Sequence, residues 1–464
     1  RLRCRQLNSA LASPDPLQFD QPLNVSAHMS IRFNSAVSLC GLAAGLSYTV
    51  LAFASHVWDR PPLWIFFACM ACAAAAMIAV FRSLALGREA HAYRKVMLWA
   101  VLFRIIGFFG HPLYEDDYYR YLWDGREFVN TGNPYLHPPA AFSHESLPPP
   151  FSRILKNINY PQIPTIYGPV CQYAFAAAYL IAPGRVEPLK LIFTAADLFL
   201  CLVLIRFGVS PGRLALYAWS PLVIKEIVFT AHTDSLAALF SLGSVYLAQK
   251  NRTILSGFAL ALAVGAKIPS LLIAPAVVAR GRLRSLYGLC AGVTLLYLPF
   301  WRQATDSRGL ASFLRNWEFN SFGFAILEHV FHIPGAKIVT FGIVAAVLLL
   351  LWRKSWKAQP KDFSANMAWG VFCLFSPVVN PWYLVSWVPW TALAPTGWAI
   401  AACLTPLLSY ATGNNLPSSG LTGYNHPWWV RPAELLPVLL LLGASAIMWI
   451  RPTKSVGRSL QSDS

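Results

Sequence analysis

Long apolar stretches alternate with short polar connections along most of the chain. Apolar runs recur from about residue 34 to about residue 450. A helix of roughly 20 mostly apolar residues is long enough to cross the hydrocarbon core of a bilayer. The pattern therefore predicts an all-α polytopic membrane protein, a bundle of roughly 12 to 14 transmembrane helices that forms one domain over residues 34–450.

The two ends of the sequence differ from this pattern. Residues 1–33 form a polar segment that starts at Arg1 and lacks the apolar centre of a signal peptide, so we interpret it as a candidate non-native segment, with Met29 as a candidate start. Residues 451–464 are polar again, and Arg451, Lys454 and Arg458 predict a cytoplasmic tail.

Composition supports a membrane protein and argues against nucleic-acid binding. Of the 464 residues, 56% are hydrophobic and only 12% are charged, whereas about a quarter are charged in a typical soluble domain. The net charge of +17 comes from Lys and Arg in short connections between apolar runs, as expected of cytoplasmic loops. No basic patch interleaved with aromatic residues is available to hold nucleic acid, so no such partner is expected.

The same charges predict a topology. Four cations between residues 82 and 95 place that connection in the cytoplasm, and residues 111–166, the longest polar stretch, then lie outside. His232, Asp234 and Lys267 are also expected near the outer face. The two apolar segments 167–183 and 188–205 join this outside loop to a connection on the inside, which requires only one crossing. We therefore expect the shorter segment, 167–183, to be interfacial or re-entrant.

The loop 111–166 contains a dense acidic and aromatic run, Glu-Asp-Asp-Tyr-Tyr-Arg-Tyr-Leu-Trp-Asp-Gly-Arg, at residues 115–126. As a helix it would place Asp117, Tyr121 and Asp124 on one stripe, and Asp116 could pair with Arg120 one turn later. The helix should stop at residues 132–134, where glycine and a pre-proline position disfavour continuation.

This run permits two interpretations. A solvated acidic turn between interfacial aromatic residues is common in membrane proteins. Carboxylates, arginines and aromatic rings together, however, suit the recognition of sugar hydroxyls, sugar faces and phosphate.

Several polar residues interrupt apolar segments further along the chain. A charge such as Lys267 near mid-membrane costs roughly 2.5 to 3.5 kcal/mol, so it is expected to have a partner or a task, the alternative being a snorkelling lysine. Asp197 is expected to be the structural partner of another polar group. Glu226, His232 and Asp234 also interrupt an apolar region, but His232 and Asp234 diverge on a helix and no third ligand is evident, so no metal site is expected.

Cys69 and Cys72 form a C-x-x-C pair, but they lie in an apolar run, and no histidine or second cysteine pair completes a metal or redox site.

Motifs in and after the first loop resemble a known family. They are the run from Asp116 to Arg126, the run Gly132-Asn133-Pro134-Tyr135, Asn159-Tyr160-Pro161 and residues 164–169, Pro-Thr-Ile-Tyr-Gly-Pro. The sequence is similar there to bacterial GT-C membrane glycosyltransferases, and most of all to polyprenyl-phosphate-mannose-dependent mannosyltransferases. Residues 219–221, 226–234, 267 and 380–383 are weaker echoes. Gly168 departs from the pattern, where a second proline is expected, as do the two spans that precede the loop.

The resemblance implies inverting transfer of a sugar, mannose above all, from a polyprenyl monophosphate donor to an acceptor hydroxyl. The family's general base is a carboxylate in this loop, and Asp117 matches it best, with Asp116 as the alternate. Candidate phosphate ligands are Arg120, Arg126, Lys267 and His232. For the two arginines, an ion pair with Asp116 or Glu127 is the alternative.

The remaining candidate substrate-binding residues are aromatic or polar side chains of the same outer region. They are Tyr118, Tyr121, Trp123, Asp124, Asn133, Tyr167, Asp234, Trp382 and Tyr383.

No cofactor is expected to be required, although Mg or Mn is possible. The expected partners are the lipid-linked donor, a glycan, glycolipid or protein acceptor, and the lipid bilayer. The implied location is the bacterial inner membrane, with the active site facing outward. One alternative is transfer of another sugar by the same architecture. The other is a transporter or flippase of a lipid-linked saccharide, but transporters often have two similar halves and the halves of this chain are unlike.

Overall fold

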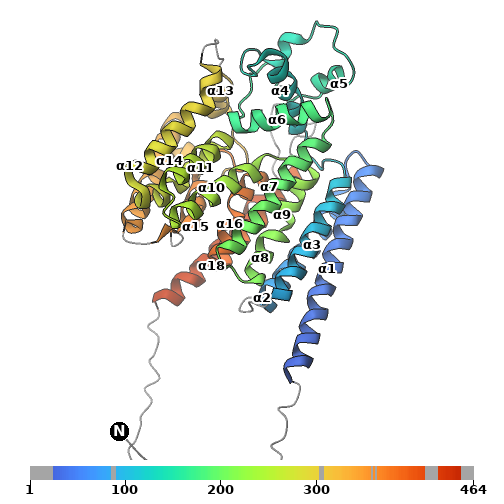
Figure 1. Ribbon diagram of the computed structural model, residues 1–464, viewed down its shortest axis with the longest axis vertical. Coiled ribbons are helices and arrows are strands. Elements are labelled where there is room, and N and C mark those ends of the chain that lie inside the picture. Colours follow the sequence, from blue (N-terminus) through green and yellow to red (C-terminus); the bar gives the residue numbers. More distant parts are fainter. Residues whose placement is uncertain are drawn as a thin grey trace, which may run out of the picture.

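The computed structural model describes residues 25–84, 90–301, 308–356, 359–360, 363–412 and 427–450. These residues form helices joined by turns and loops, and among them no strand is present beyond one isolated bridge between Phe319 and Val378 (Figure 1). Our expectations for residues 1–24 and for the tail at 451–464 lie outside the described residues.

The helices follow one another closely. The N-terminal half contains α1 (Val25–Val57), α2 (Leu63–Leu84), α3 (Ala90–Phe109), α4 (Asp117–Thr131), η1 (Pro139–Phe142), α5 (Phe151–Lys156), α6 (Pro169–Ile181), α7 (Glu187–Arg206), α8 (Pro211–Ala218), α9 (Pro221–Val223) and η2 (Ile224–Phe229). The rest contains α10 (Asp234–Gln249), α11 (Thr253–Ala266), η3 (Ile268–Ile273), α12 (Ala274–Tyr297), η4 (Leu298–Phe300), α13 (Arg308–Asn316), α14 (Gly323–Ser355), α15 (Ala365–Phe375), η6 (Pro381–Ser386), α16 (Val388–Leu393), α17 (Gly397–Ala402), η7 (Thr405–Thr412) and α18 (Val430–Ile450).

The prediction of an all-α polytopic membrane protein is confirmed. Six helical segments of the described chain are long and apolar enough to cross a membrane, and four shorter apolar helices of 10 to 17 residues accompany them. We expected roughly 12 to 14 spans; the bundle instead combines full-length spans with short and broken helices. The first helix also starts earlier than expected, at Val25 rather than near residue 34.

The first loop forms a helical cap at one end of the bundle. Figure 1 shows α4, α5 and α6 together at the top, with α6 running across the long axis. Because α6 has only 13 residues, it is among the helices shorter than a full span, whereas α7 is a full-length candidate. The expectation that the segment 167–183 is interfacial or re-entrant stays a prediction.

Two glycines let backbones approach one another under this cap. A Cβ atom added at Gly125 of α4 would lie 2.4 Å from the carbonyl oxygen of Phe175 in α6. One added at Gly168 would lie 2.2 Å from the carbonyl oxygen of Gly265 in α11. A proline at position 168 would bring such a Cβ, so the departure from the family pattern has a local steric reason.

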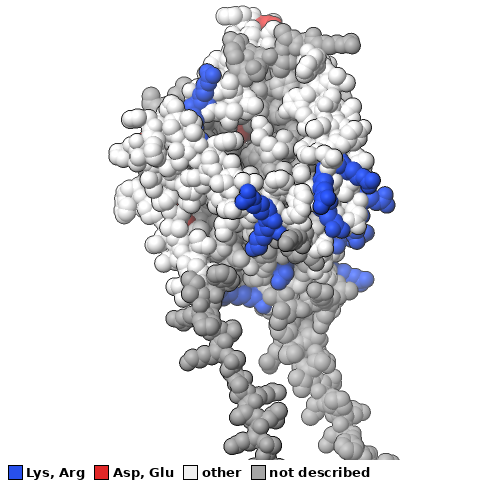
Figure 2. Space-filling view, turned by 90° about the vertical axis from the view of Figure 1, so that its left-hand side faces the viewer, with Lys and Arg blue, Asp and Glu red and all other residues white. Residues whose placement is uncertain are grey.

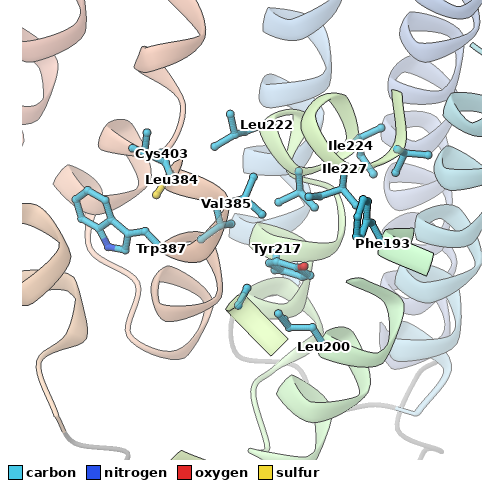
Figure 3. Close-up of a cluster of buried hydrophobic side chains, with 14 of the residues drawn as sticks. Phe193, Leu200, Tyr217, Leu222, Ile224, Ile227, Leu384, Val385, Trp387 and Cys403 are labelled. Atoms are coloured by element: carbon cyan, nitrogen blue, oxygen red, sulfur yellow. The ribbon is translucent and has the colours of Figure 1, made fainter. Parts of the chain in front are cut away.

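The centre of the bundle is formed by segments that are far apart in the sequence. Figure 3 shows Phe193 and Leu200 of α7, Ile224 and Ile227 of η2, and Leu384 and Val385 of η6 around one cluster, and all of these side chains are buried. Within a membrane such packing stabilises the fold mainly through close contact, because lipid tails are as apolar as the side chains themselves.

A buried ion pair ties three helices together beside this core. Arg104 of α3 forms two hydrogen bonds with Asp197 of α7, of 2.7 and 3.1 Å, and Tyr217 of α8 donates a third bond of 2.7 Å to Asp197. Breaking such a pair leaves an uncompensated buried charge. The prediction that Asp197 is a structural partner of another polar group is thus confirmed.

On one face of the molecule, basic residues lie mostly below the cap. In Figure 2, most of the Lys and Arg on the visible face lie over the lower part of the molecule. This distribution follows the sequence pattern, in which cations occupy the connections at the ends opposite the first loop.

Candidate active site

The acidic run that begins the cap sends its three carboxylates in three directions. Glu115 is buried beside Lys225 and Tyr410. Asp116 accepts a hydrogen bond from the side-chain amide of Asn159. Asp117, the first residue of α4, faces His232 and Tyr167 instead.

Asp117 is partly open to solvent and is held by two aromatic side chains. Its side chain is 23% exposed, and its Oδ2 atom lies 3.7 Å from Nε2 of the buried His232. The hydroxyl of Tyr167 donates to the same oxygen at 3.3 Å. Both distances are at or beyond the limit of a normal hydrogen bond.

His232 is fixed on two further sides. Its Nδ1 atom lies 3.0 Å from Oε2 of Glu226, and its ring stacks on Trp382 with the centroids 4.4 Å apart and the planes 15° apart. Its Nε2 atom has no hydrogen-bond partner within the described residues, and this atom faces Asp117. A buried polar atom without a partner is unusual and marks this point of the molecule.

A second polar group lies close to the first. Lys267, just after α11, donates a hydrogen bond to Oδ1 of Asp234 at the start of α10, and its Nζ lies 3.6 Å from the centre of the Tyr383 ring. The lysine side chain remains 17% exposed. Asp117 is near enough to interact electrostatically with both Lys267 and Tyr383. Residues from five separate parts of the chain therefore meet here.

Asp124 lies within the cap rather than in this group. It is 1% exposed and accepts hydrogen bonds from Arg120 at 2.9 Å, from Gln172 at 3.1 Å and from the hydroxyl of Thr165. The predicted pairing of Asp116 with Arg120 is wrong, because Arg120 reaches Asp124 and the carbonyl of Ile163 instead. Arg120 and Asp124 thereby fasten the loop before α6 onto α4.

Arg126 is likewise engaged inside the cap. It pairs with Glu127, and its guanidinium lies 5.1 Å from the Trp123 ring and 5.6 Å from the Phe151 ring. This is the ion pair that we named as the alternative to phosphate contact. Trp123 itself is 1% exposed and packs against Phe142. The phosphate contact predicted for Arg126 and the substrate contact predicted for Trp123 both stay predictions.

The other predicted substrate residues of the loop differ in their surroundings. Tyr121 is buried, stacked on Phe175 and edge-on to Tyr167. Asn133 is buried and accepts a hydrogen bond from the backbone of Tyr135 at 3.0 Å, which shapes the turn after α4. Tyr118 is only half-buried and lies against Tyr119, with the ring centroids 4.2 Å apart.

Burial raises the pKa of the two neighbouring carboxyl groups, Glu115 and Asp116. Burial, followed by the charge of Asp117, raises the pKa of Asp116 to about 8. Burial also raises the pKa of Glu115 well above its usual range. With a pKa of about 8, Asp116 is therefore mostly protonated at neutral pH.

Sequence reasoning missed two members of this region. Lys225 and Tyr410 are both buried and both contact Glu226. Lys225 in an apolar run was a signal of the same kind as Lys267, since a buried charge needs a partner. Tyr410 carried no signal, because tyrosine is common near membrane boundaries.

The described residues contain no group of three or more His, Cys, Asp or Glu side chains that would hold a metal ion. The expectation that the reaction needs no cofactor stays a prediction.

The geometry places the partly exposed carboxylate of Asp117 beside a buried histidine and near a lysine. Residues 35–282, just over half of the chain, match a family model described as alpha-(1->6)-mannopyranosyltransferase, N-terminal domain. The chain belongs to this family and is a mannosyltransferase. The match includes Asp117, His232 and Lys267, whereas Trp382, Tyr383 and Tyr410 lie beyond it. No curated protein and no solved structure matches the chain significantly.

Proposed function

We propose that this mannosyltransferase has GT-C architecture and transfers mannose, with inversion, from a polyprenyl monophosphate to an acceptor hydroxyl. The observation that carries the proposal is the setting of Asp117: a partly exposed carboxylate in a buried aromatic site, beside His232 and near Lys267. The family membership supports the sugar, and the apolar surroundings support a lipid-linked donor.

Asp117 acts as the general base of a single displacement. It removes the proton from the acceptor hydroxyl while that oxygen forms a bond to the anomeric carbon. The bond between this carbon and the phosphate oxygen breaks at the same time, and its electron pair leaves with the polyprenyl phosphate. Attack from the face opposite the leaving group inverts the anomeric configuration, and the proton on Asp117 is later released to water.

Lys267 stabilises the leaving phosphate. It is a partly exposed cation at the end of α11, and Asp234 and the Tyr383 ring hold it in place. A fixed cation in a site with little water stabilises developing negative charge more strongly than one in bulk solvent. Arg120 and Arg126 serve the structure of the cap in this proposal, because both are paired within it.

The reaction takes place at the extracytoplasmic face of the bacterial inner membrane. Basic connections lie away from the cap, and such connections are typically cytoplasmic, which supports an outward-facing Asp117. The acceptor is a glycan, a glycolipid or a protein. A monophosphate donor carries no pyrophosphate for a divalent cation to neutralise, so transfer should not require one.

The test uses the purified protein in lipid bilayers, radiolabelled polyprenyl-phosphate-mannose and an octyl α-(1→6)-dimannoside as acceptor probe. We expect labelled trisaccharide whose new linkage has the opposite anomeric configuration to the donor, measured by NMR. Retained configuration would refute the inverting step. Failure with this donor and with pentose and glucose donors, together with transbilayer movement of the labelled lipid, would favour a flippase instead.

A further inference from the structure

A closed group of charged and polar side chains lies directly behind His232. Glu226 is at its centre: its Oε2 atom accepts from Lys225 at 3.0 Å and lies 3.0 Å from Nδ1 of His232, while its Oε1 atom accepts from the Tyr410 hydroxyl at 2.7 Å. Lys225 also donates to the Tyr410 hydroxyl. All four side chains are fully buried, so Glu226 has no access to a substrate.

The local backbone explains how Glu226 and His232 come together. Residues 224–229 form the π-helical segment η2, and Ala231 has a left-handed φ of 61°. The chain therefore folds back, so that the amide of His232 donates to the carbonyl of Glu226 at 2.9 Å. Single π-helical turns of this kind are frequent at functional sites.

The imidazole ring is consequently held on three sides. Glu226 fixes Nδ1, Trp382 covers one ring face, and the remaining nitrogen, Nε2, faces Asp117. A carboxylate on one nitrogen of a histidine fixes the ring orientation and the position of the proton on it. Glu226 thus determines what His232 presents to Asp117.

We propose that Glu226 is a positioning residue for the transfer reaction, acting on Asp117 through His232. This inference rests on the proposed function, in which Asp117 is the base. Misplacing a reacting group by about 1 Å can reduce a rate by about 100-fold, so a residue without substrate contact can control turnover in this way.

A purely structural role for the same group makes a different prediction. Glu226 also joins η2 to Tyr410 of η7, and a simple tie between segments would lower stability when it is broken. It would not, however, lower kcat selectively, and its effect would not depend on His232.

The experiment compares Glu226→Gln, His232→Gln and the double variant in bilayers, with polyprenyl-phosphate-mannose and the dimannoside probe. Gln keeps the size of Glu226 but removes the charge-assisted hydrogen bond to His232. We expect kcat to fall about 10- to 100-fold with the KM for the donor unchanged, and the double variant to be no slower than His232→Gln alone. Glu434→Gln is the matched control, because Glu434 is another buried glutamate, bonded to Asn320 at 2.8 Å.

Three results would overturn the inference. They are a Glu226→Gln enzyme as fast as the Glu434→Gln control, a loss confined to KM, and losses that multiply in the double variant. If Glu226→Gln does not fold, Tyr410→Phe replaces it, because this change removes the hydroxyl that bonds Glu226 and Lys225 but leaves Glu226 and its contact with His232 in place. A fall in kcat that disappears in the His232→Gln background then supports the inference, and its absence or persistence counts against it.

The same assay separates the two proposals. Absence of transfer by the wild type would overturn the proposed function and this inference with it. Transfer by the wild type with an undiminished Glu226→Gln variant would overturn the inference alone.

Discussion

The Nε2 atom of His232 lies 3.7 Å from the Oδ2 atom of Asp117, although the two residues are far apart in the sequence. The first belongs to the turn between η2 and α10, and the second begins α4 in the cap. Since His232 is fully buried and Asp117 is 23% exposed, the pair joins the buried interior of the bundle to a side chain that is open to solvent.

Replacing His232 should slow transfer without unfolding the protein. Gln fills much of the same space but cannot carry a charge toward Asp117, so we expect kcat to fall about 10- to 100-fold. His137→Gln is the control, because His137 is exposed within the same loop. Steady-state kinetics of both variants test this, and equal rates would show that the contact has no part in turnover.

Replacing Lys267 should affect the donor above all. Lys267→Gln removes the one charge proposed to face the phosphate, and we expect the KM for polyprenyl-phosphate-mannose to rise about tenfold or more, with kcat lowered as well. Lys156→Gln changes an exposed lysine of the first loop and should be silent. A donor KM equal to that of the wild type would remove Lys267 from phosphate binding.

The pKa of Asp116 predicts a pH dependence of donor binding. This group has a pKa of about 8, so it is neutral below that pH and adds a second negative charge beside Asp117 above it. An anionic donor should then bind less well, and its KM should rise as the pH passes about 8. Because the pKa in the folded state is raised from the ordinary 3.8 to about 8, the fold also loses stability as the pH rises between these two values.

Asp116→Asn should abolish that rise in KM, because the amide stays neutral at every pH. The profile is measured for wild type and variant between about pH 6 and about pH 9, with the exposed Asp59→Asn as control. A rise that persists in Asp116→Asn would assign the titration to another group. Loss of all activity in Asp116→Asn would instead support Asp116 as the base.

Asp124 should matter for the stability of the cap rather than for chemistry. Asp124→Asn weakens the bonds from Arg120, Thr165 and Gln172, and bonds to charged groups each contribute about 1.5 to 3 kcal/mol. We expect a lower thermal midpoint and faster tryptic cleavage between residues 111 and 166. Unchanged cleavage with reduced kcat would place Asp124 among the substrate contacts instead.

The local features of this site could be predicted from the sequence, and the long-range ones could not. The helix from Asp117 and its end at Gly132, with a left-handed φ of 75°, follow from residue pattern and from glycine and proline preferences. The divergence of Glu115, Asp116 and Asp117 follows from the geometry of adjacent residues.

The partners of these residues depend on which helices become neighbours. Arg120 had a carboxylate one turn away on either side, and only the packing of residues 163–172 on α4 selects Asp124 over Asp116. Glu226 contacts His232 because the π-helical turn of η2 folds the chain back, and Tyr410, which is distant in the sequence, donates a hydrogen bond to Glu226. From a single sequence we could predict only that these buried charges have partners, and not which residues those partners are.

The most direct test of the account is the rate of mannose transfer by Asp117→Asn. The amide preserves the shape of the side chain but cannot take the proton of the acceptor hydroxyl, so we expect transfer to fall by about 100-fold or more, with donor binding and thermal stability retained. Asp59→Asn, run beside it, should equal the wild type. Transfer by Asp117→Asn at the wild-type rate would contradict the account, because Asp117 could then not be the general base.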